Sequence, residues 1–262
     1  MLDVVFRSCD NSIVHPERGD RFINVDKTTL IKKCFLSLVN SIEKSKIKDV
    51  KLWIIDDHSK ELLLDYFMSK CKEKNIEVEI VSMDERGYNY SALKQFEYCK
   101  DKGREWVYSV EDDYLHFPKS IEVLYNEAKN FSNKFGRVIA IRPDDDVFTY
   151  SPNTKYSQMP CRILLGTERH WRTLNNTHNT LFTHVNVFKK YWELFASLAK
   201  FFKITSVNED GTINTIWSDG VTKDGPVPLL SPIPTLAVHI SQNNEPSFTN
   251  YKDLWDSIKI DT

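Results

Sequence analysis

The sequence predicts an α/β fold in which one mostly parallel sheet is flanked by helices, and three observations carry this prediction. Short apolar runs typical of buried strands alternate with segments whose apolar residues recur at helical spacing. Polar clusters directly follow the predicted strands, at the position where parallel sheets bind their ligands. The length of 262 residues and the apolar fraction of 41% are sufficient for one large domain with a substantial core.

The first half of the chain alternates strands and helices. The predicted strands cover 4–6, 52–55, 76–81, 106–110 and 138–141. The predicted helices cover 30–42, 62–71, 91–102 and 119–131. Asp26 is a good N-cap for the first helix, and Pro118 suits the start of the last. Strands that are joined by helices in this way form βαβ units and therefore a parallel sheet.

The alternation of strand and helix signals weakens in the second half of the chain. Residues 144–180 are polar and indicate a long loop, of the kind that is usually functional or mobile. A helix is predicted over 186–203. The prolines of 225–234 are expected to interrupt regular structure, and 235–240 is expected to form a last short strand. We expect one domain over residues 1–262.

The composition limits the class of protein. A net charge of −2 and a pI near 6.4 do not favour a nucleic-acid coat protein. The cysteines are odd in number and form no CxxC pair, which favours free thiols in a reducing compartment. No basic-then-apolar leader precedes the first strand, and no apolar run approaches the ~20 residues of a membrane span. We therefore expect a soluble, cytoplasmic protein.

Glu111, Asp112 and Asp113, which we name the acidic triplet, follow the predicted strand 106–110. Hard divalent cations prefer carboxylate oxygens, and a bound ion would cancel the repulsion among adjacent charges. The alternative is a solvated turn. Because the triplet follows a buried type of strand and lies between aromatic residues, the pattern favours a metal site to which it contributes one or two ligands. Asp113 is expected to touch the metal, and Asp112 to face the ribose or the donor sugar or to be a second ligand. Glu111 is expected to be the member most easily replaced.

Other strand ends carry groups suited to a nucleotide. Asp57 could accept a hydrogen bond from a uracil-type base or a ribose hydroxyl, or it could cap the next helix. Arg86, followed by Gly87, could bind phosphate or base, or be an ordinary loop arginine. Arg7 and Ser8 follow the first strand. Successive strands thus place polar groups at one edge of the sheet, which is stronger evidence for a site than any single motif.

Candidates for further roles come from the second half. His239 ends an apolar run and could be a third metal ligand or an edge histidine. Asp210, or Glu209 beside it, could act as a general base or cap a helix. The aspartates 144–146 are expected to belong to a loop, with contact to an acceptor as the lesser alternative. Some His and Trp side chains could line an acceptor pocket or belong to a packed lid, and they include Trp171, His178 and His184.

The order of these motifs resembles the GT-A glycosyltransferases of family 2, which have a Rossmann-like fold. In that family a strand ending in Asp-Asp-x-Ser precedes an x-x-Gly-x-x-x-Ala loop, a strand ending in Asp-x-Asp and, later, a carboxylate base. The matching positions are Arg7-Ser8, Asp57, Arg86-Gly87 with Ser91-Ala92, Asp112-Asp113 and Asp210. Along this series, Asp57, Arg86, Asp113 and Asp210 are separated by 29, 27 and 97 residues. The metal motif departs from the family pattern because it reads Glu-Asp-Asp.

The resemblance implies an enzyme that moves one hexose or pentose from a nucleotide-diphosphate sugar to an acceptor hydroxyl. The reaction would invert the anomeric carbon, with Asp210 as base and Mn²⁺ or Mg²⁺ as cofactor. A UDP-sugar is the favoured donor, and the acceptor would be a glycan, a lipid carrier, a protein or a modified nucleobase. Residues 1–115 would form the nucleotide-binding half and residues 116–262 the acceptor-binding half.

Other classes of protein stay open. A nucleotidyltransferase could share the sheet and the carboxylate chemistry, but the sequence has no glycine-rich phosphate loop near its start. A non-catalytic nucleotide-sugar or glycan-binding protein would bind a donor without turnover, and Asp113 and Asp210 would then be dispensable. Turnover of a donor sugar separates these classes.

Overall fold

The computed structural model describes residues 1–10, 21–152, 160–201, 212–218, 227–241, 245–246 and 249–260. The first half builds the parallel strands β1 (Leu2–Ser8), β2 (Val50–Asp56), β3 (Glu77–Ser82) and β4 (Trp106–Glu111). Its helices are α1 (Lys27–Lys44), α2 (Glu61–Glu73), α3 (Tyr88–Asp101) and α4 (Ser120–Phe135). The elements predicted for this half are therefore confirmed, with shifts at their ends. Asp26 caps α1, since its Oδ1 accepts the Thr29 N–H at 2.9 Å.

Two short strands also lie in the first half. They are β5 (Tyr114–His116), between β4 and α4, and β6 (Ala140–Ile141), at the end of the predicted strand 138–141. The second half contains the strands β7 (Ile163–Leu165), β8 (His170–Leu174), β9 (Leu181–His184), β10 (Trp217–Ser218), β11 (Val227–Ile233) and β12 (Ala237–His239). Its helices are α5 (Val185–Lys190), α6 (Trp192–Phe201) and α7 (Tyr251–Ser257), with single 3₁₀ turns at Val147–Thr149 and Ile213–Ile216. The helix predicted over 186–203 is thus divided into α5 and α6.

Two expectations for this half are wrong. The segment 144–180 is not a single long loop, because it contains the antiparallel pair β7–β8. The prolines do not interrupt regular structure either, because Pro228 and Pro232 both lie within β11. Backbone N–H groups alternate between the two sides of a strand, so prolines four residues apart remove donors from the same side and leave the other side intact.

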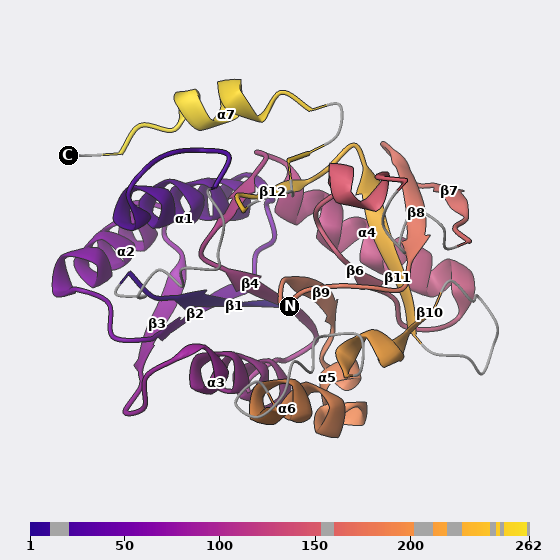
Figure 1. Cartoon of the computed structure of the whole chain (residues 1–262), viewed down its shortest axis with the longest axis horizontal. Coiled ribbons are helices and arrows are strands. Elements are labelled where there is room, and N and C mark those ends of the chain that lie inside the picture. Colours follow the sequence, from indigo (N-terminus) through magenta and orange to yellow (C-terminus); the bar gives the residue numbers. More distant parts are fainter. Residues whose placement is uncertain are drawn as a thin grey trace.

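Ten of the described strands form one sheet in the order β3-β2-β1-β4-β9-β6-β11-β8-β7, with β10 beside β11. The sheet is parallel from β3 to β4 and becomes mixed where β9 runs antiparallel to both β4 and β6. Helices α1, α2, α4 and α7 lie on one side of the sheet, and α3, α5 and α6 lie on the other (Figure 1). The predicted α/β fold is confirmed.

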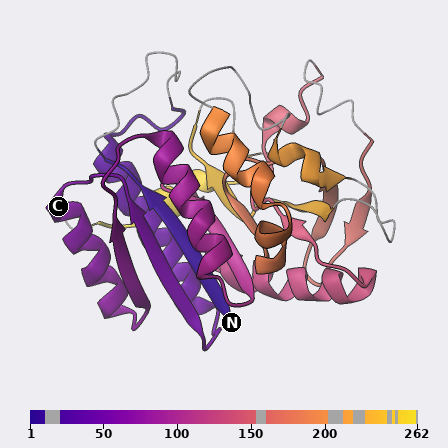
Figure 2. The ribbon, with the colours of Figure 1, turned by 90° about the horizontal axis from the view of Figure 1, so that it is seen from below.

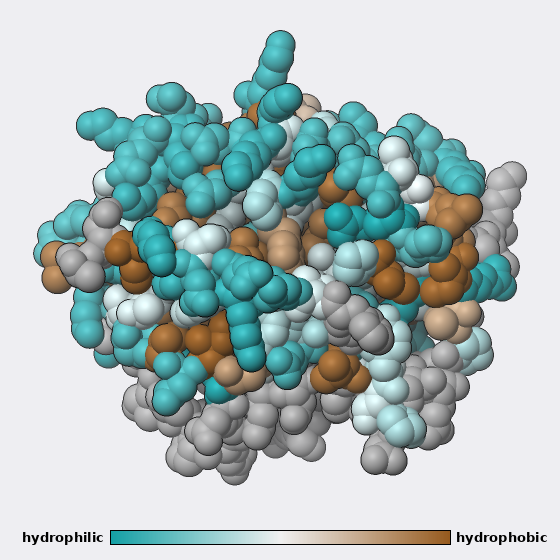
Figure 3. All heavy atoms as spheres, turned by 90° about the horizontal axis from the view of Figure 1, so that it is seen from above, coloured by the Kyte–Doolittle hydropathy of each residue, from teal (hydrophilic) through white to brown (hydrophobic). Residues whose placement is uncertain are grey.

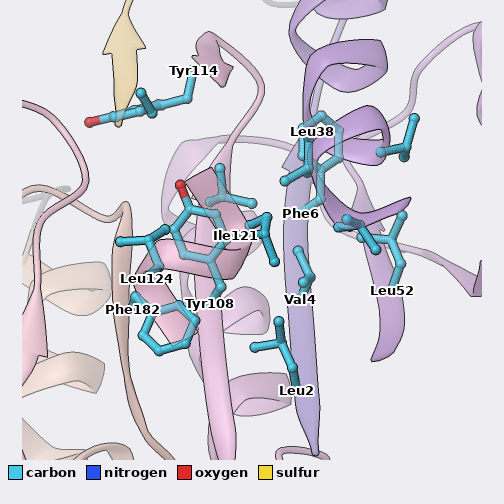
Figure 4. Packing of buried hydrophobic residues seen from close by; sticks show 14 of the residues in the cluster. Leu2, Val4, Phe6, Leu38, Leu52, Tyr108, Tyr114, Ile121, Leu124 and Phe182 are labelled. Carbon is cyan, nitrogen blue, oxygen red and sulfur yellow. The ribbon is translucent and has the colours of Figure 1, made fainter. Parts of the chain in front are cut away.

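Strand β1 shows why helices cover both faces. Its alternate side chains Leu2, Val4 and Phe6 project toward the layer of α1 and pack with Leu38 of that helix (Figure 4). Val5 points the other way, into a second apolar cluster that α3, α5 and α6 help to form. Figure 2 shows α3 and α6 lying over that second face. Both faces of this part of the sheet are therefore buried, as expected of a parallel sheet.

The outer surface above α1 and α7 is mostly hydrophilic, and its apolar side chains occur in small separate groups (Figure 3). Such scattered apolar groups are normal on a folded protein. A search of the helices in the described residues finds none that combines the length and the apolar character of a membrane span.

The separate two-stranded sheet of β5 and β12 completes the edge at which the site lies. β5 begins directly after the acidic triplet, and its Tyr114 is opposite His239 of β12. Beneath this pair, α1 and α7 contribute to a third apolar cluster that includes Leu115, Val238 and Trp255. The pairing therefore brings a residue from near the end of the chain against the acidic triplet.

The buried His116 of β5 predicts a loss of stability in acid. Burial lowers the pKa of His116 to about 3, and its Nε2 lies 2.8 Å from the Tyr108 hydroxyl. Below the usual pKa of about 6.5, His116 becomes protonated in the unfolded chain but stays neutral in the folded chain. The free energy of unfolding therefore loses nothing from His116 above about pH 6.5, and it falls by roughly 1.4 kcal/mol per pH unit as the pH drops toward 3. Urea unfolding between pH 6 and pH 4 should show a flatter slope for His116→Gln than for the native chain, and equal slopes would contradict this account.

Candidate functional site

The carboxyl ends of the parallel strands bring their polar residues together at one edge of the sheet. Ser8 is in register with Asp56, and Arg7 is in register with Glu111. The backbone N–H of Asp57 donates to the Ser8 carbonyl at 2.9 Å. The residues that follow β1, β2 and β4 therefore form one continuous cluster. The loop after β3 joins this cluster because the backbone N–H of Gly87 donates to the Asp57 carboxylate.

Each carboxylate of the acidic triplet lies beside its own basic side chain. All the side chains involved are between 11% and 17% exposed. The basic partners come from β1, α1 and β12, so three separate elements converge on one short connection. The pairs are Arg7–Glu111, Lys27–Asp112 and His239–Asp113. The triplet is therefore a partly buried, charge-compensated site.

Asp113 and His239 form the pair best placed for a metal ion. Burial by itself would raise the pKa of Asp113, but the charges of His239, Lys27 and Arg21 hold that pKa well below its usual value. Burial by itself would lower the pKa of His239, whereas the Asp113 charge more than offsets this and raises it to about 9. Tyr114 stacks on the His239 ring, with ring centroids 4.5 Å apart, and fixes its plane.

The donor atoms of this pair fit a divalent ion, whose binding would displace the proton that His239 carries beside Asp113, because only the neutral imidazole is a metal ligand. His239 Nε2 and Asp113 Oδ2 are 3.6 Å apart, which is beyond a good hydrogen bond and suits two neighbouring ligands of one ion. Asp113 Oδ1 is buried and accepts no hydrogen bond within the described part of the chain. No group of three or more His, Cys, Asp or Glu ligands exists among the described residues. Such a site suits Mg²⁺ or Mn²⁺, which commonly combine one or two protein ligands with phosphate oxygens and water.

Arg7 and Glu111 clamp β1 to β4. The Arg7 guanidinium pairs with Glu111, lies 3.4 Å from Ser91 Oγ and covers the Tyr88 ring at 4.6 Å. Burial by itself would lower the pKa of Arg7, but its acidic neighbours, Glu111 first among them, raise it above its usual value. Asn179 adds a contact to Glu111 at 3.5 Å. These contacts argue against the expectation that Glu111 is the most easily replaced member of the triplet.

Asp57 holds the loop that follows β3. Its carboxylate accepts the Gly87 N–H at 3.0 and 3.3 Å, and His58 Nδ1 lies 3.2 Å from Oδ1. A carboxylate offers about four acceptor positions, so Asp57 keeps capacity for a ligand. The neighbouring Asp56 is the residue that binds the turn, since it accepts the Ser59 N–H at 3.2 Å. Arg86 is exposed beside Gly87.

Replacing Gly87 with Ala is expected to destabilise the protein by about 1–3 kcal/mol. Gly87 has φ 116° and ψ 160°, a region that is essentially restricted to glycine. A Cβ atom at Gly87 would meet no other atom within 4 Å, so the expected cost is conformational rather than steric crowding. Urea unfolding measures this cost. A matched control is Gly136→Asn, because Gly136 ends α4 in the left-handed region that Asn tolerates. Equal costs for the two substitutions would contradict the prediction.

The candidate acceptor residues separate into two groups. His178 lies near the metal pair, with its ring centroid 5.7 Å from that of His239. His184 is opposite Trp106, the first residue of β4, and thus lies at the other end of that strand. Its Nδ1 accepts the Asn186 N–H and caps α5. Trp171 is fully buried in the core against Phe131. His178 therefore stays a candidate for the acceptor side, whereas the positions of His184 and Trp171 indicate structural roles.

The aspartates 144–146 lie outside the named helices and strands, as expected of a loop, but their side chains are buried. The side chains of Arg142 and Arg172 compensate them, and all five are at most 4% exposed. Arg142 lies 3.3 Å from both Asp144 and Asp146, and Arg172 lies 2.8 Å from Asp145. We name these five residues the buried charge cluster. The Asp144 charge contributes to the raised pKa of His239, so the cluster lies close enough to influence the site.

The expected base cannot be placed in this geometry. Glu209 and Asp210 lie outside the described residues. The described chain resumes at Thr212, and its Asn214 accepts the Thr177 N–H at 2.8 Å, beside His178. The assignment of Asp210 as base therefore stays a prediction from the sequence.

The comparison with protein families matches residues 24–195, more than half of the chain, to glycosyl transferase family 2. The chain belongs to glycosyl transferase family 2. The matched segment includes Asp57, Gly87 and the acidic triplet, but it ends before Asp210 and His239. The comparison with curated proteins found no significant match.

Solved structures with similar folds are also glycosyltransferases. Galactosyltransferase LgtC, in complex with donor and acceptor sugar analogues, has a TM-score of 0.51 and 10% identity, and the match covers 99% of this chain and 97% of LgtC. S. aureus TarS with UDP-GlcNAc has a TM-score of 0.46 and 11% identity over 76% of this chain and 53% of TarS. Mannosyltransferase PcManGT from Pyrobaculum calidifontis, with GDP-Man and Mn²⁺, has a TM-score of 0.43 and 11% identity over 72% and 46%. The family 2 chain thus spans about half the length of the TarS and PcManGT chains, and the likeness to LgtC supports the predicted GT-A fold.

Several residues of this candidate site were not predicted from the sequence. Lys27 and Arg7 each neutralise one member of the acidic triplet, and Tyr88 and Asn179 surround the Arg7–Glu111 pair. Arg7 was expected at the nucleotide, but its role as the partner of Glu111 has no local signal. Lys27 reads as an ordinary first-turn helix residue, because nothing in its neighbourhood indicates a carboxylate 85 residues away.

Proposed function

We propose that the protein is a metal-dependent glycosyltransferase that moves one sugar from a nucleotide-diphosphate sugar to an acceptor hydroxyl. Membership of family 2 supports the reaction class. The observation that carries the metal dependence is the Asp113–His239 pair, in which Asp113 Oδ1 is buried without a hydrogen-bond partner among the described residues. This pair lies at the same sheet edge as Asp57 and Gly87, which are suited to a nucleoside.

Each group at this edge has a proposed task in donor binding. Asp113 and His239 would hold Mn²⁺ or Mg²⁺ together with oxygens of the donor diphosphate, and the ion would stabilise the negative charge of the leaving group. Asp57, which the Gly87 N–H orients, would accept a hydrogen bond from the base. A uracil-type base offers a suitable N–H, so a UDP-sugar is the favoured donor. Arg86 would reach the phosphate or the base.

The acceptor side is assigned from the sequence order. Asp210 would remove the proton of the acceptor hydroxyl, whose oxygen would then form the new bond to the anomeric carbon as the bond to the diphosphate oxygen breaks. Attack from the side opposite to the leaving group would invert the anomeric carbon. Glu209 is the reserve base. His178, close to His239, is the proposed contact to the acceptor, which would be a glycan, a lipid carrier, a protein or a modified nucleobase.

A donor screen tests this function. Purified protein is incubated with UDP-, GDP-, CMP- and dTDP-sugars, with and without Mn²⁺ or Mg²⁺, in the presence of a broad acceptor set. We expect release of the nucleoside diphosphate from one donor class, dependent on the ion and abolished by a chelator. Binding without turnover across all donors and acceptors would instead identify a binding protein. Release of pyrophosphate from a nucleoside triphosphate and a sugar phosphate would identify a nucleotidyltransferase.

A further inference from the structure

Lys27 is a cation to which the motif pattern of the sequence assigns no role. It is the first residue of α1, and its ammonium lies 2.5 Å from Asp112 Oδ1. Its side chain is 16% exposed, so it is mostly enclosed at the site rather than extended into solvent. Its charge also helps to hold the pKa of Asp113 low, so Lys27 acts on both aspartates of the triplet.

Asp112 is held by the protein from two sides. Oδ1 pairs with Lys27, and Oδ2 accepts the backbone N–H of Cys9 at 2.9 Å. Asp113, in contrast, keeps Oδ1 without a hydrogen-bond partner among the described residues. The two adjacent aspartates are therefore equipped for different tasks. Asp113 is available to an ion, and Asp112 fixes the position of a lysine.

An ammonium group in this position suits a diphosphate. Lysine has three N–H donors, and Asp112 takes one of them in the described part of the chain, which leaves two for ligand oxygens. Sugar transfer adds a further negative charge to the diphosphate when the bond to the anomeric carbon breaks. A preorganised cation is most effective where charge develops during the reaction.

We propose that Lys27 binds the diphosphate of the donor and that Asp112 positions it, so that a protein cation and the divalent ion share the charge of the leaving nucleoside diphosphate. This inference rests on the proposed function and adds a protein cation at the donor diphosphate. Asp112 is thereby a positioning residue on the protein side, and Asp113 with His239 provides the metal position.

Calorimetric binding to the full chain tests the proposal with UDP and GDP, with the matching nucleosides uridine and guanosine, and with Mn²⁺ alone. The variant Lys27→Met removes the charge and keeps most of the length of the side chain. Lys27→Arg keeps the charge. Lys44→Met makes the same change at the exposed far end of α1 and is the matched control. If Lys27→Met does not fold, Lys27→Gln replaces it, because its amide can still donate to Asp112.

The expected changes in affinity have opposite signs for the nucleoside diphosphate and for Mn²⁺. Lys27→Met lowers the affinity for the nucleoside diphosphate roughly tenfold or more, as loss of a charged hydrogen bond does. It leaves the affinity for the nucleoside unchanged. It raises the affinity for Mn²⁺, because it removes a positive charge beside the aspartates. Lys27→Arg keeps most of the diphosphate affinity, and Lys44→Met equals the native chain.

Two results would overturn the proposal. Equal losses for diphosphate and nucleoside would mean that Lys27 only supports the structure of the site, and an unchanged diphosphate affinity would mean that Lys27 does not touch it. If the native chain bound neither UDP nor GDP while all variants folded, the proposed function itself would fail. That outcome is visible without any variant and is therefore distinguishable from the failure of Lys27 alone.

Discussion

Replacing Asp113 with Asn is expected to reduce sugar transfer by about a thousandfold or more, because an ion that stabilises the leaving group contributes several kcal/mol. Asp113 carries the buried oxygen with no hydrogen bond to the described chain, and His239 is 3.6 Å from its other oxygen. Asn keeps the shape of Asp but removes the charge that hard divalent cations prefer. The measurement is release of nucleoside diphosphate from the donor found in the screen, together with Mn²⁺ affinity by calorimetry.

The Asp113→Asn variant is expected to stay folded, which makes the loss of activity interpretable. The pKa of His239 is raised mainly by Asp113, so removing that charge lowers the pKa and allows the imidazole to release its proton rather than stay a buried cation without its nearest partner. Asp65→Asn, at an exposed position on α2, is the matched control and should transfer sugar like the native chain. Transfer within tenfold of the native rate, at unchanged Mn²⁺ affinity, would refute Asp113 as the metal ligand.

Local signals explain why much of the first half could be predicted from the sequence. The runs that form β2 and β4 are short and apolar, and α1 has a wide apolar face with a capping aspartate before it. Parallel strands place their carboxyl ends at one edge, so the clustering of Asp57 and the acidic triplet follows from topology. Prediction was possible where each residue's role is set by its neighbours in the chain.

Contacts between distant segments explain what could not be predicted. Lys27 and His239 reach the acidic triplet from α1 and β12, and no local spacing indicates which cation faces which carboxylate. Pro232 was expected to interrupt regular structure, but whether a proline fits within a strand such as β11 depends on the neighbouring strands. The burial of the aspartates 144–146 could not be predicted, because their compensating partner Arg172 lies on another strand.

Replacing Arg142 with Met is expected to lower the free energy of unfolding by about 3–5 kcal/mol, the usual cost of removing one partner from a buried ion pair. Arg142 is 1% exposed and lies between Asp144 and Asp146, at 3.3 Å from each. Burial by itself would lower the pKa of Arg142, but these aspartates raise it well above its usual value, so the side chain stays charged. Without Arg142, two buried carboxylates would lose their nearest cation. Urea unfolding near pH 7 measures the change.

Two control variants distinguish the cost of leaving buried carboxylates uncompensated from the general effect of an Arg→Met substitution. Arg162→Met makes the same change at an exposed position before β7 and should alter the free energy of unfolding by less than about 0.5 kcal/mol. Adding Asp144→Asn and Asp146→Asn to Arg142→Met removes the uncompensated charges and should recover part of the stability. A cost below about 1 kcal/mol for Arg142→Met would mean that water reaches the buried charge cluster. The Asp144 charge also raises the pKa of His239. The triple variant, which lacks that charge, should therefore have a lower pKa of His239 than the native chain, and NMR titration of the imidazole measures it.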